Sequence, residues 1–363
     1  VVLARSVVRD LRTGSSCWLQ SAGVACSGSD MLGSRSTAQT GATAIEGARL
    51  IGGCVGITLA GVVITFALGR PDSCQDSSDC LAILDGGFRT FNKFAVCSLS
   101  TALFLQVATT AVLFGKTRSM VGVVRDIEYT FLPPLLMSIA FFMVLAEHIS
   151  SFSLFFVHVA ADGVGGKHGR PIHSTILLEW VVTVPILLIL AGCCALNQPL
   201  KQVCRPVLVT NIYMVIAWSA YFVPIEPVRW VFIALSFSLY AWASYDMATW
   251  VFNFRATARK DISQRNLRCA LTVALIVVFF IYGMVFLAGF MDILSARHEL
   301  MFVLTWNIWT KVGFLLGFLG IRVGQFNDLM VMLIRRKVLP MDQLLPKDLE
   351  AWGADMDASP LMD

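Results

Sequence analysis

The sequence predicts an all-α, polytopic membrane protein, and three observations lead to that fold class. Of its 363 residues, 56% are hydrophobic and only 14% are charged, whereas soluble domains carry about 25% charged residues. Apolar stretches of about 20 residues, enough to span a bilayer as a helix, recur along the chain. The loops between these stretches fall into two groups that differ in their content of lysine and arginine. The net charge of +4 is modest, and we expect no nucleic-acid partner and no metal site.

Eight membrane spans are expected from the apolar windows. They lie at 48–69, 91–115, 129–160, 172–196, 205–224, 228–254, 267–294 and 299–334. Residues 1–47, rich in Ser, Gly and Thr, are expected to form a flexible tail. A bundle of seven helices is expected over 91–335, and 336–363 form a tail or linker with no catalytic signature.

The basic residues indicate the orientation. Lysines and arginines gather in the segments 116–125, 201–205, 255–268 and 335–337, which lie on one side of the predicted bundle. Positively charged loops favour the cytoplasmic side, so both termini are expected in the cytoplasm. An even number of spans agrees with that orientation.

Two features outside the bundle core leave alternatives open. Gly52 and Gly56 in the first span form a small-xxx-small pair, which allows either packing within the bundle or a homo-oligomer contact. Cys74 and Cys80 share a polar loop on the opposite side from the basic segments. They form either a local disulfide or two free thiols.

Lys311 is the most informative residue, because it lies in the middle of the last apolar span. An ammonium at the centre of a membrane helix costs about 2.5–3.5 kcal/mol on insertion scales. A chain that keeps a lysine there pairs it with an acid or uses its amine in a Schiff base. Glu179, two turns inside the fourth predicted span, supplies a carboxylate for either purpose.

Several motifs, taken together, resemble the microbial (type 1) rhodopsins. They are Glu179-Trp180-x-x-Thr183-x-Pro185, Val209-Thr210-Asn211-Ile212-Tyr213-Met214, Phe279-x-x-Tyr282-Gly283-x-x-Phe286 and Trp306-Asn307-Ile308-Trp309-Thr310-Lys311. The first has the glutamate form typical of channelrhodopsins, and the third keeps the family's Trp-x-x-Tyr-Pro-x-x-Trp pattern with three replacements. The resemblance covers roughly 91–335.

The resemblance implies a seven-helix retinal-binding core with one additional N-terminal transmembrane helix. All-trans retinal would be bound covalently to Lys311 as a Schiff base, with Glu179 as the counterion. A protonated imine in an apolar pocket needs such a fixed negative partner. The remaining residues expected around the retinal are Trp180, Thr183, Val184, Pro185, Met214, Phe279, Tyr282, Phe286 and Asn307.

Departures from the family pattern narrow the function. Asn307 stands where most relatives have an aspartate, Leu190 where pumps keep a proton donor, and Ile176 where pumps keep an arginine. An outward proton pump is therefore not expected. Val184 and Asn211 replace a pair that bridges two helices in many relatives. Trp218 lies where a small residue usually faces the retinal ring.

Glu147, in the third predicted span, is expected at a similar depth to Glu179. One interpretation makes it a second counterion or a gate. The other makes it a protonated acid that is hydrogen-bonded to Ser150 or Ser151. Both stay open.

The eight-span layout resembles rhodopsins linked to cyclases, phosphodiesterases or bestrophin-like channels. We therefore expect a non-enzymatic light sensor that signals to a cytoplasmic effector, either beyond Asp363 or on another polypeptide. The alternative is a light-gated ion channel, with Glu147, Ser151, His158 and Asp162 as a polar stripe. A third reading, a transporter that uses the ion pair of Lys311 and Glu179, predicts no chromophore.

Overall fold

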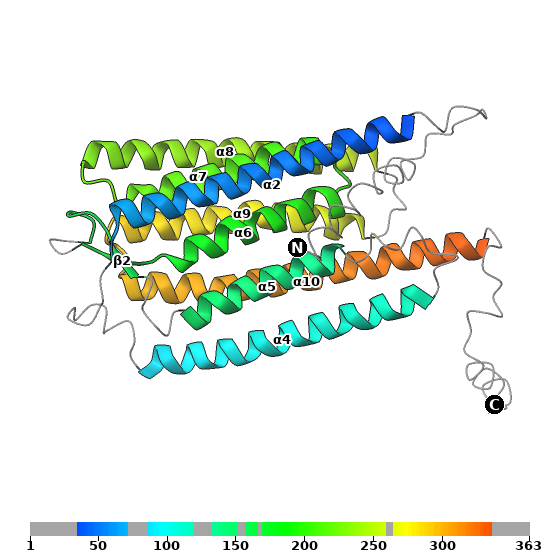
Figure 1. Cartoon of the computed structure of the whole chain (residues 1–363), viewed down its shortest axis with the longest axis horizontal. Helices are drawn as coiled ribbons and strands as arrows, with labels where there is room; N and C mark the ends of the chain where they lie inside the picture. The colour runs from blue at the N-terminus through cyan, green and yellow to red at the C-terminus, as the bar shows by residue number, and fades with distance from the viewer. Residues whose placement is uncertain are drawn as a thin grey trace, which may run out of the picture.

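The computed structural model describes residues 35–71, 86–119, 132–150, 157–165, 169–258 and 264–335. Eight long helices run side by side in this part of the chain (Figure 1). They are α2 (Arg35–Leu68), α4 (Gly86–Ser119), α5 (Leu132–Ser150), α6 (Thr175–Ile189), α7 (Leu200–Ala220), α8 (Glu226–Thr257), α9 (Arg265–Phe290) and α10 (Ala296–Arg335). The predicted all-α bundle is confirmed.

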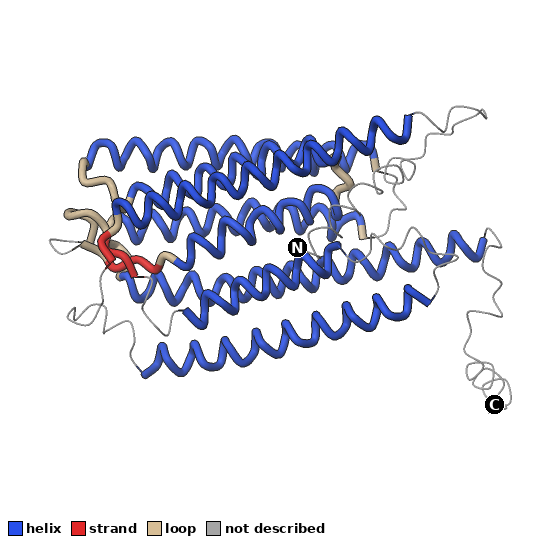
Figure 2. The backbone as a smooth tube through the Cα atoms, in the orientation of Figure 1, coloured by secondary structure: helices blue, strands red, loops and turns tan. Residues whose placement is uncertain are grey.

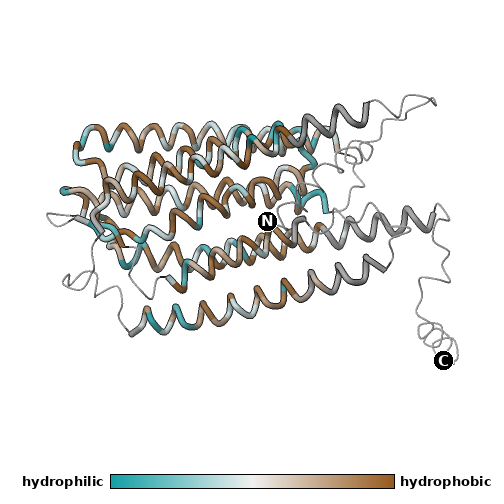
Figure 3. Tube along the Cα trace, in the orientation of Figure 1, coloured by the Kyte–Doolittle hydropathy of each residue, from teal (hydrophilic) through white to brown (hydrophobic). Residues whose placement is uncertain are grey.

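Apolar residues dominate the helices along most of their length (Figure 3). Seven of the described helices are long and apolar enough to cross a membrane, and α5 adds a shorter apolar segment, Leu135–Ser150. The chain is thus an integral membrane protein. α2 begins at Arg35, so part of the segment predicted as a flexible tail is helical.

A small antiparallel sheet closes one end of the bundle (Figure 2). Its strands, in spatial order, are β1 (Arg70–Pro71), β2 (Val157–Val159) and β3 (Pro171–His173). α2 begins and α10 ends at the opposite end of the bundle (Figure 1).

The sheet corrects two predicted spans. The span predicted over 129–160 ends as a helix at Ser150, and His158 belongs to β2. The span predicted from 172 begins at Thr175, because the preceding residues form β3. A short apolar run fits a buried strand as well as a helix, so hydrophobicity alone does not separate the two.

α2 packs along α7 and α6 rather than beside α4, the next helix in the chain. Figure 1 shows α2 and α4 on opposite sides of the bundle. α4 packs on α5, while α10 contacts both α9 and α5. The additional N-terminal helix therefore lies against the helices at the centre of the sequence.

The glycines of α2 fall on two faces. A Cβ at Gly53 would lie 2.7 Å from Leu208, so this glycine permits close packing on α7. Gly52 and Gly56 are exposed, and a Cβ on either would meet no described atom within 4 Å. Packing of this pair within the bundle is therefore wrong for the described residues, because successive residues of a helix point in directions about 100° apart and Gly53, not Gly52, points at α7. The oligomer contact stays a prediction, and Cys74 and Cys80 lie outside the described residues.

Candidate functional site

The site is built around Lys311, which α10 carries into the interior of the bundle. The lysine is only 2% exposed, and its Nζ lies 3.0 Å from Oε1 of Glu179 on α6. Glu179 is 1% exposed. Two opposite charges buried this deeply are tolerable only when they are paired and hydrogen-bonded. The structure therefore brings together the two residues that the sequence singled out.

Asn307, one helical turn before the lysine, connects the charged groups. Nζ of Lys311 donates to Oδ1 of Asn307 at 3.0 Å, and the hydroxyl of Tyr282 donates to the same oxygen. The amide nitrogen of Asn307 donates to Oε2 of Glu147 at 3.0 Å and to Oε2 of Glu179 at 3.3 Å. One neutral side chain thus accepts from the cation and donates to both acids.

Glu147, carried by α5, has its carboxyl group in this cluster. It and Glu179 share a donor nitrogen, which places both carboxyl groups at the same level of the bundle. Ser150 donates to the backbone carbonyl of Glu147 rather than to its carboxyl group. Ser151 lies outside the described residues. Among the described residues, Asn307 rather than Ser150 is the partner of the Glu147 side chain.

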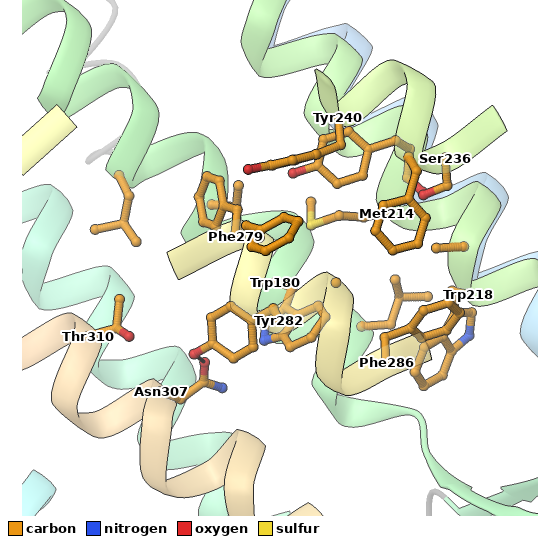
Figure 4. Close-up of a pocket in the computed structure, with 18 of the residues that line it drawn as sticks. Trp180, Met214, Trp218, Ser236, Tyr240, Phe279, Tyr282, Phe286, Asn307 and Thr310 are labelled. Atoms are coloured by element: carbon orange, nitrogen blue, oxygen red, sulfur yellow. Dashed lines mark hydrogen bonds between the residues drawn. The ribbon is translucent and has the colours of Figure 1, made fainter. Parts of the chain in front are cut away.

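A cavity opens beside Lys311 between α6, α7, α8, α9 and α10 (Figure 4). Aromatic side chains form most of its wall, and the rings of Trp180 and Tyr282 lie 5.0 Å apart. The predicted residues that line it are Trp180, Val184, Met214, Phe279, Tyr282, Phe286, Asn307 and Lys311. The cavity is therefore apolar and flat-walled, with an amine and its polar partners in the wall.

The family model described as "Bacteriorhodopsin-like protein" matches residues 93–323. The chain belongs to this family. The family implies a retinal chromophore, and the residues present fit one, because a buried amine stands in the wall of a cavity lined mostly by aromatic and aliphatic side chains. The comparison with curated proteins finds no match.

Solved structures of rhodopsins share the fold of this rhodopsin. The transmembrane domain and linker region of *Salpingoeca rosetta* rhodopsin phosphodiesterase aligns with a TM-score of 0.53 and 13% identity, over 85% of this chain and 92% of that chain. Thermophilic rhodopsin from *Rubrobacter xylanophilus* aligns with a TM-score of 0.51 and 17% identity, over 64% and 96%. The light-driven proton pump of *Leptosphaeria maculans* aligns with a TM-score of 0.50 and 15% identity, over 65% and 96%.

Two residues predicted around the retinal lie elsewhere. Thr183 and Pro185 are buried in α6 and do not line the cavity. The hydroxyl of Thr183 has no hydrogen-bond partner among the described residues. Although Thr183 follows Glu179 by one turn, the carboxyl group of Glu179 reaches toward Lys311 and Asn307 instead.

Sequence reasoning missed the contribution of α8 to the cavity. Ser236, Phe237 and Tyr240 line the wall from this helix, together with Tyr213 of α7. The hydroxyl of Tyr240 donates to the carbonyl of Ile276, which fixes its ring. Tyr240 follows Phe237 by three residues and Ser236 by four, and this helical spacing is the signal that could have found this face.

Pro185 acts on the backbone of α6. A proline within a helix leaves the carbonyl four residues earlier without its usual donor, and here that carbonyl belongs to Val181. The side-chain nitrogen of Asn211 on α7 donates to the Val181 carbonyl at 3.4 Å. Asn211 therefore bridges the two helices through the backbone. Five residues after Pro185, η3 (Leu190–Ala195) continues α6 as a π-helical turn in which Leu190 is buried.

A second polar cluster, which the sequence analysis did not identify, lies at the sheet end of this rhodopsin. Arg170 is 4% exposed, and its Nη2 lies 2.7 Å from Oε2 of Glu299, at the start of α10. Its Nη1 lies 3.4 Å from Asp292, and Nη2 also donates to the carbonyl of Leu294. Tyr221 donates to the other oxygen of Glu299. The guanidinium thus joins the loop before β3 to the loop between α9 and α10.

His173, in β3 just before the span that starts at Thr175, is buried in the same region. Its Nδ1 lies 2.7 Å from Oγ1 of Thr175. Burial disfavours the charged ring and lowers the pKa of His173 to about 4. The imidazole is therefore neutral at pH 7.

Proposed function

We propose that this rhodopsin is a photoreceptor that holds all-trans retinal covalently at Lys311 and signals to a cytoplasmic partner. The observation that carries the proposal is the Lys311 amine, buried in the wall of an aromatic cavity and 3.0 Å from Glu179. An amine used only as a structural charge needs its acid but has no need of an aromatic cavity beside it.

The protein's own residues have distinct tasks in this proposal. Retinal, when bound, supplies the absorption of visible light and an isomerisation. Glu179 holds a negative charge beside the Lys311 nitrogen, which favours a positive charge on that atom. Asn307 keeps Glu179, Glu147 and Lys311 in one hydrogen-bonded arrangement. Trp180 orients the ligand by ring contact and excludes water.

α10 supports a signalling role because it joins the site to the far end of the bundle without a break. The 25 residues from Lys311 to Arg335 are helical throughout and extend about 36 Å. The apolar span ends near Ile321, so the helix continues about four turns beyond it. A change at Lys311 would displace this extension, where a partner or effector could read it.

The orientation that we propose places both termini in the cytoplasm. α2 begins and α10 ends at one end of the bundle, and the basic segments predicted on that side include 201–205 and 335–337. The sheet would then lie outside the cytoplasm. No catalytic role is proposed for the chain itself, and any enzymatic output would belong to the partner.

The alternative is a light-gated ion channel. The observation that favours it is the cluster of Glu147, Glu179 and Asn307, a polar group in the middle of the bundle. The predicted polar stripe is weaker than expected, because His158 lies in β2 and Asp162 in the following turn rather than on α5. Photocurrent in voltage-clamped cells that express residues 1–363 separates the two functions. A robust current would show that the protein is a channel and would contradict the sensor hypothesis.

The experiment that tests retinal binding is the visible spectrum of the purified protein after incubation with all-trans retinal. We expect a visible band for the wild type and none for Lys311→Ala. Lys201→Ala is the matched control, because Lys201 is an exposed lysine at the start of α7 and should keep the band. If neither the wild type nor the control forms a band, Lys311 is a structural or transport charge and the proposal is wrong.

A further inference from the structure

The additional helix α2 makes a side-chain hydrogen bond to a residue of the cavity wall. The indole nitrogen of Trp218, on α7, donates to Oγ1 of Thr65 at 2.8 Å, across 153 positions of sequence. Thr65 is 2% exposed and Trp218 is 7% exposed, so water does not compete for this bond. Trp218 also lines the cavity.

The hydrogen-bonding capacity of Thr65 directs this contact. Its hydroxyl donates its only proton to the carbonyl of Gly61, at 2.8 Å, one turn earlier in α2. The oxygen can therefore act toward Trp218 only as an acceptor. An indole N–H is a donor only, and in a buried setting it needs an acceptor. The two groups are complementary, and the rotation of the Thr65 hydroxyl is already determined within α2.

α2 also supports this part of the wall by close packing. A Cβ at Gly61 would lie 3.1 Å from Val215 of α7 and 3.3 Å from Leu177 of α6. Leu177, like Trp218, lines the cavity. The backbone of α2 therefore lies directly behind Leu177, and a larger side chain at Gly61 would press on this wall residue and on Val215.

The sheet fixes the position of α2 along the axis of the bundle. Arg70 and Pro71, which follow α2 after the single residue Gly69, pair with Val159 and His158 of β2. The ring of Phe66 packs edge-on against His158, with centroids 5.1 Å apart. Thr65 therefore cannot slide along α7 without breaking these contacts.

Trp218 lies at the end of the cavity remote from Lys311 (Figure 4). Figure 4 shows it with Ser236 and Met214 at one end, while Asn307 and Thr310, the neighbours of Lys311, lie at the other. An indole is the largest side chain, and this one would reduce the cavity if it turned inward. Its hydrogen bond to Thr65 directs the ring nitrogen toward α2 and away from that space.

We propose that Thr65 is a positioning residue: it holds the indole of Trp218 against α2 and keeps the end of the cavity remote from Lys311 open for the apolar end of the ligand. This inference rests on the proposed retinal site. It makes the additional helix a part of the chromophore cavity rather than an attachment to the bundle. Loss of the Thr65 hydroxyl leaves a buried indole N–H without an acceptor, and the ring is then free to seek one elsewhere.

The experiment compares Thr65→Val, which keeps the shape and removes the hydroxyl, with Thr58→Val. Thr58 lies two turns earlier on α2 and makes the same kind of bond, to the carbonyl of Cys54, and no side-chain hydrogen bond joins it to a wall residue in the part of the chain that the structure describes. We measure the rate at which all-trans retinal produces the visible band and the melting temperature of the retinal-free protein. Thr65→Val should slow band formation by about tenfold and lower the melting temperature, since the bond from Trp218 is lost together with the bond to the Gly61 carbonyl. Thr58→Val and Thr65→Ser should resemble the wild type.

A double-mutant cycle with Trp218→Phe decides whether Thr65 acts through the indole. In the Trp218→Phe background, Thr65→Val should have no further effect on either quantity. Additive effects of the two substitutions, or equal behaviour of Thr65→Val and Thr58→Val, would overturn the inference. If the wild type forms no visible band, the proposed function fails. The inference is then decided by the melting temperatures of the retinal-free variants, where coupling supports it and additivity overturns it.

Discussion

Lys311 and Asn307 lie one turn apart on α10, and the lysine donates to the side-chain oxygen of the asparagine at 3.0 Å. The nitrogen of the same amide donates to Glu147 and Glu179. A carboxylate at position 307 could accept from the lysine but could not donate to the two acids. The amide is therefore the side chain that suits a site with one cation and two carboxyl groups.

Replacement of Asn307 by Asp should destabilise the protein. It removes the donor to Glu147 and Glu179 and places a third carboxyl group among them, which outweighs one additional attraction to Lys311. We expect a loss of about 2–3 kcal/mol, seen as a lower melting temperature of the retinal-free protein. Asn253→Asp, on the exposed surface of α8, is the control and should change little. Equal melting temperatures for the two variants would contradict the bridging role.

Asn211 should matter chiefly because Pro185 is present. Asn211→Leu leaves the carbonyl of Val181 buried and without a donor, at a cost of about 1–3 kcal/mol. In a Pro185→Ala background the new backbone N–H at 185 can bond that carbonyl, so Asn211→Leu should cost less. Melting temperatures of the four proteins provide the measurement. Equal costs in both backgrounds would show that the bond to Val181 does not determine the role of Asn211.

The acids that contact Arg170 should differ in their contribution to stability. Glu299 has a side chain only 19% exposed, whereas that of Asp292 is 50% exposed. Arg170→Met leaves Glu299 without its cation and should cost about 3 kcal/mol. Asp292→Asn removes a solvent-exposed pair and should cost less than about 1 kcal/mol. A larger loss of melting temperature for Asp292→Asn than for Arg170→Met would refute this ranking.

His173 should make the protein sensitive to acid. The pKa of its folded form is about 4, below the ordinary 6.5, so between these values the unfolded chain binds more protons. Its contribution is complete above pH 6.5 and is lost as the pH falls toward 4, by at most about 3 kcal/mol. His173→Asn keeps a polar partner for Thr175 and does not titrate. Its melting temperature should fall less than that of the wild type over this range, and parallel curves would be evidence against the prediction.

Much of the site followed from residue types at fixed helical spacing. Glu179 and Lys311 were recognisable because a charge inside an apolar span is costly and few functions require one. Trp180 was recognisable because it stands next to Glu179 in the same motif. Glu147 was expected near the depth of Glu179, and its carboxyl group does lie in the same cluster. For Asn307 the sequence indicated only that the negative charge of the usual aspartate is absent. Its hydrogen bonds to two acids could not be predicted, because those acids belong to other helices. The sequence predicts a helix at 157–159, where the structure has a strand, because a short apolar run has no period that distinguishes the two.

The sequence by itself determined that this protein is a helical membrane bundle with a lysine and a glutamate inside it, because hydrophobic length and the cost of a buried charge are properties of single segments. Only the tertiary structure decided which side chains meet. α2 lies against α7, so that Thr65 bonds Trp218, and Arg170 reaches Glu299 across 129 positions of sequence. Such contacts depend on how helices pack around one another. A helix face that contacts lipid, another helix or a ligand carries the same kinds of apolar residue, so the sequence does not distinguish between them.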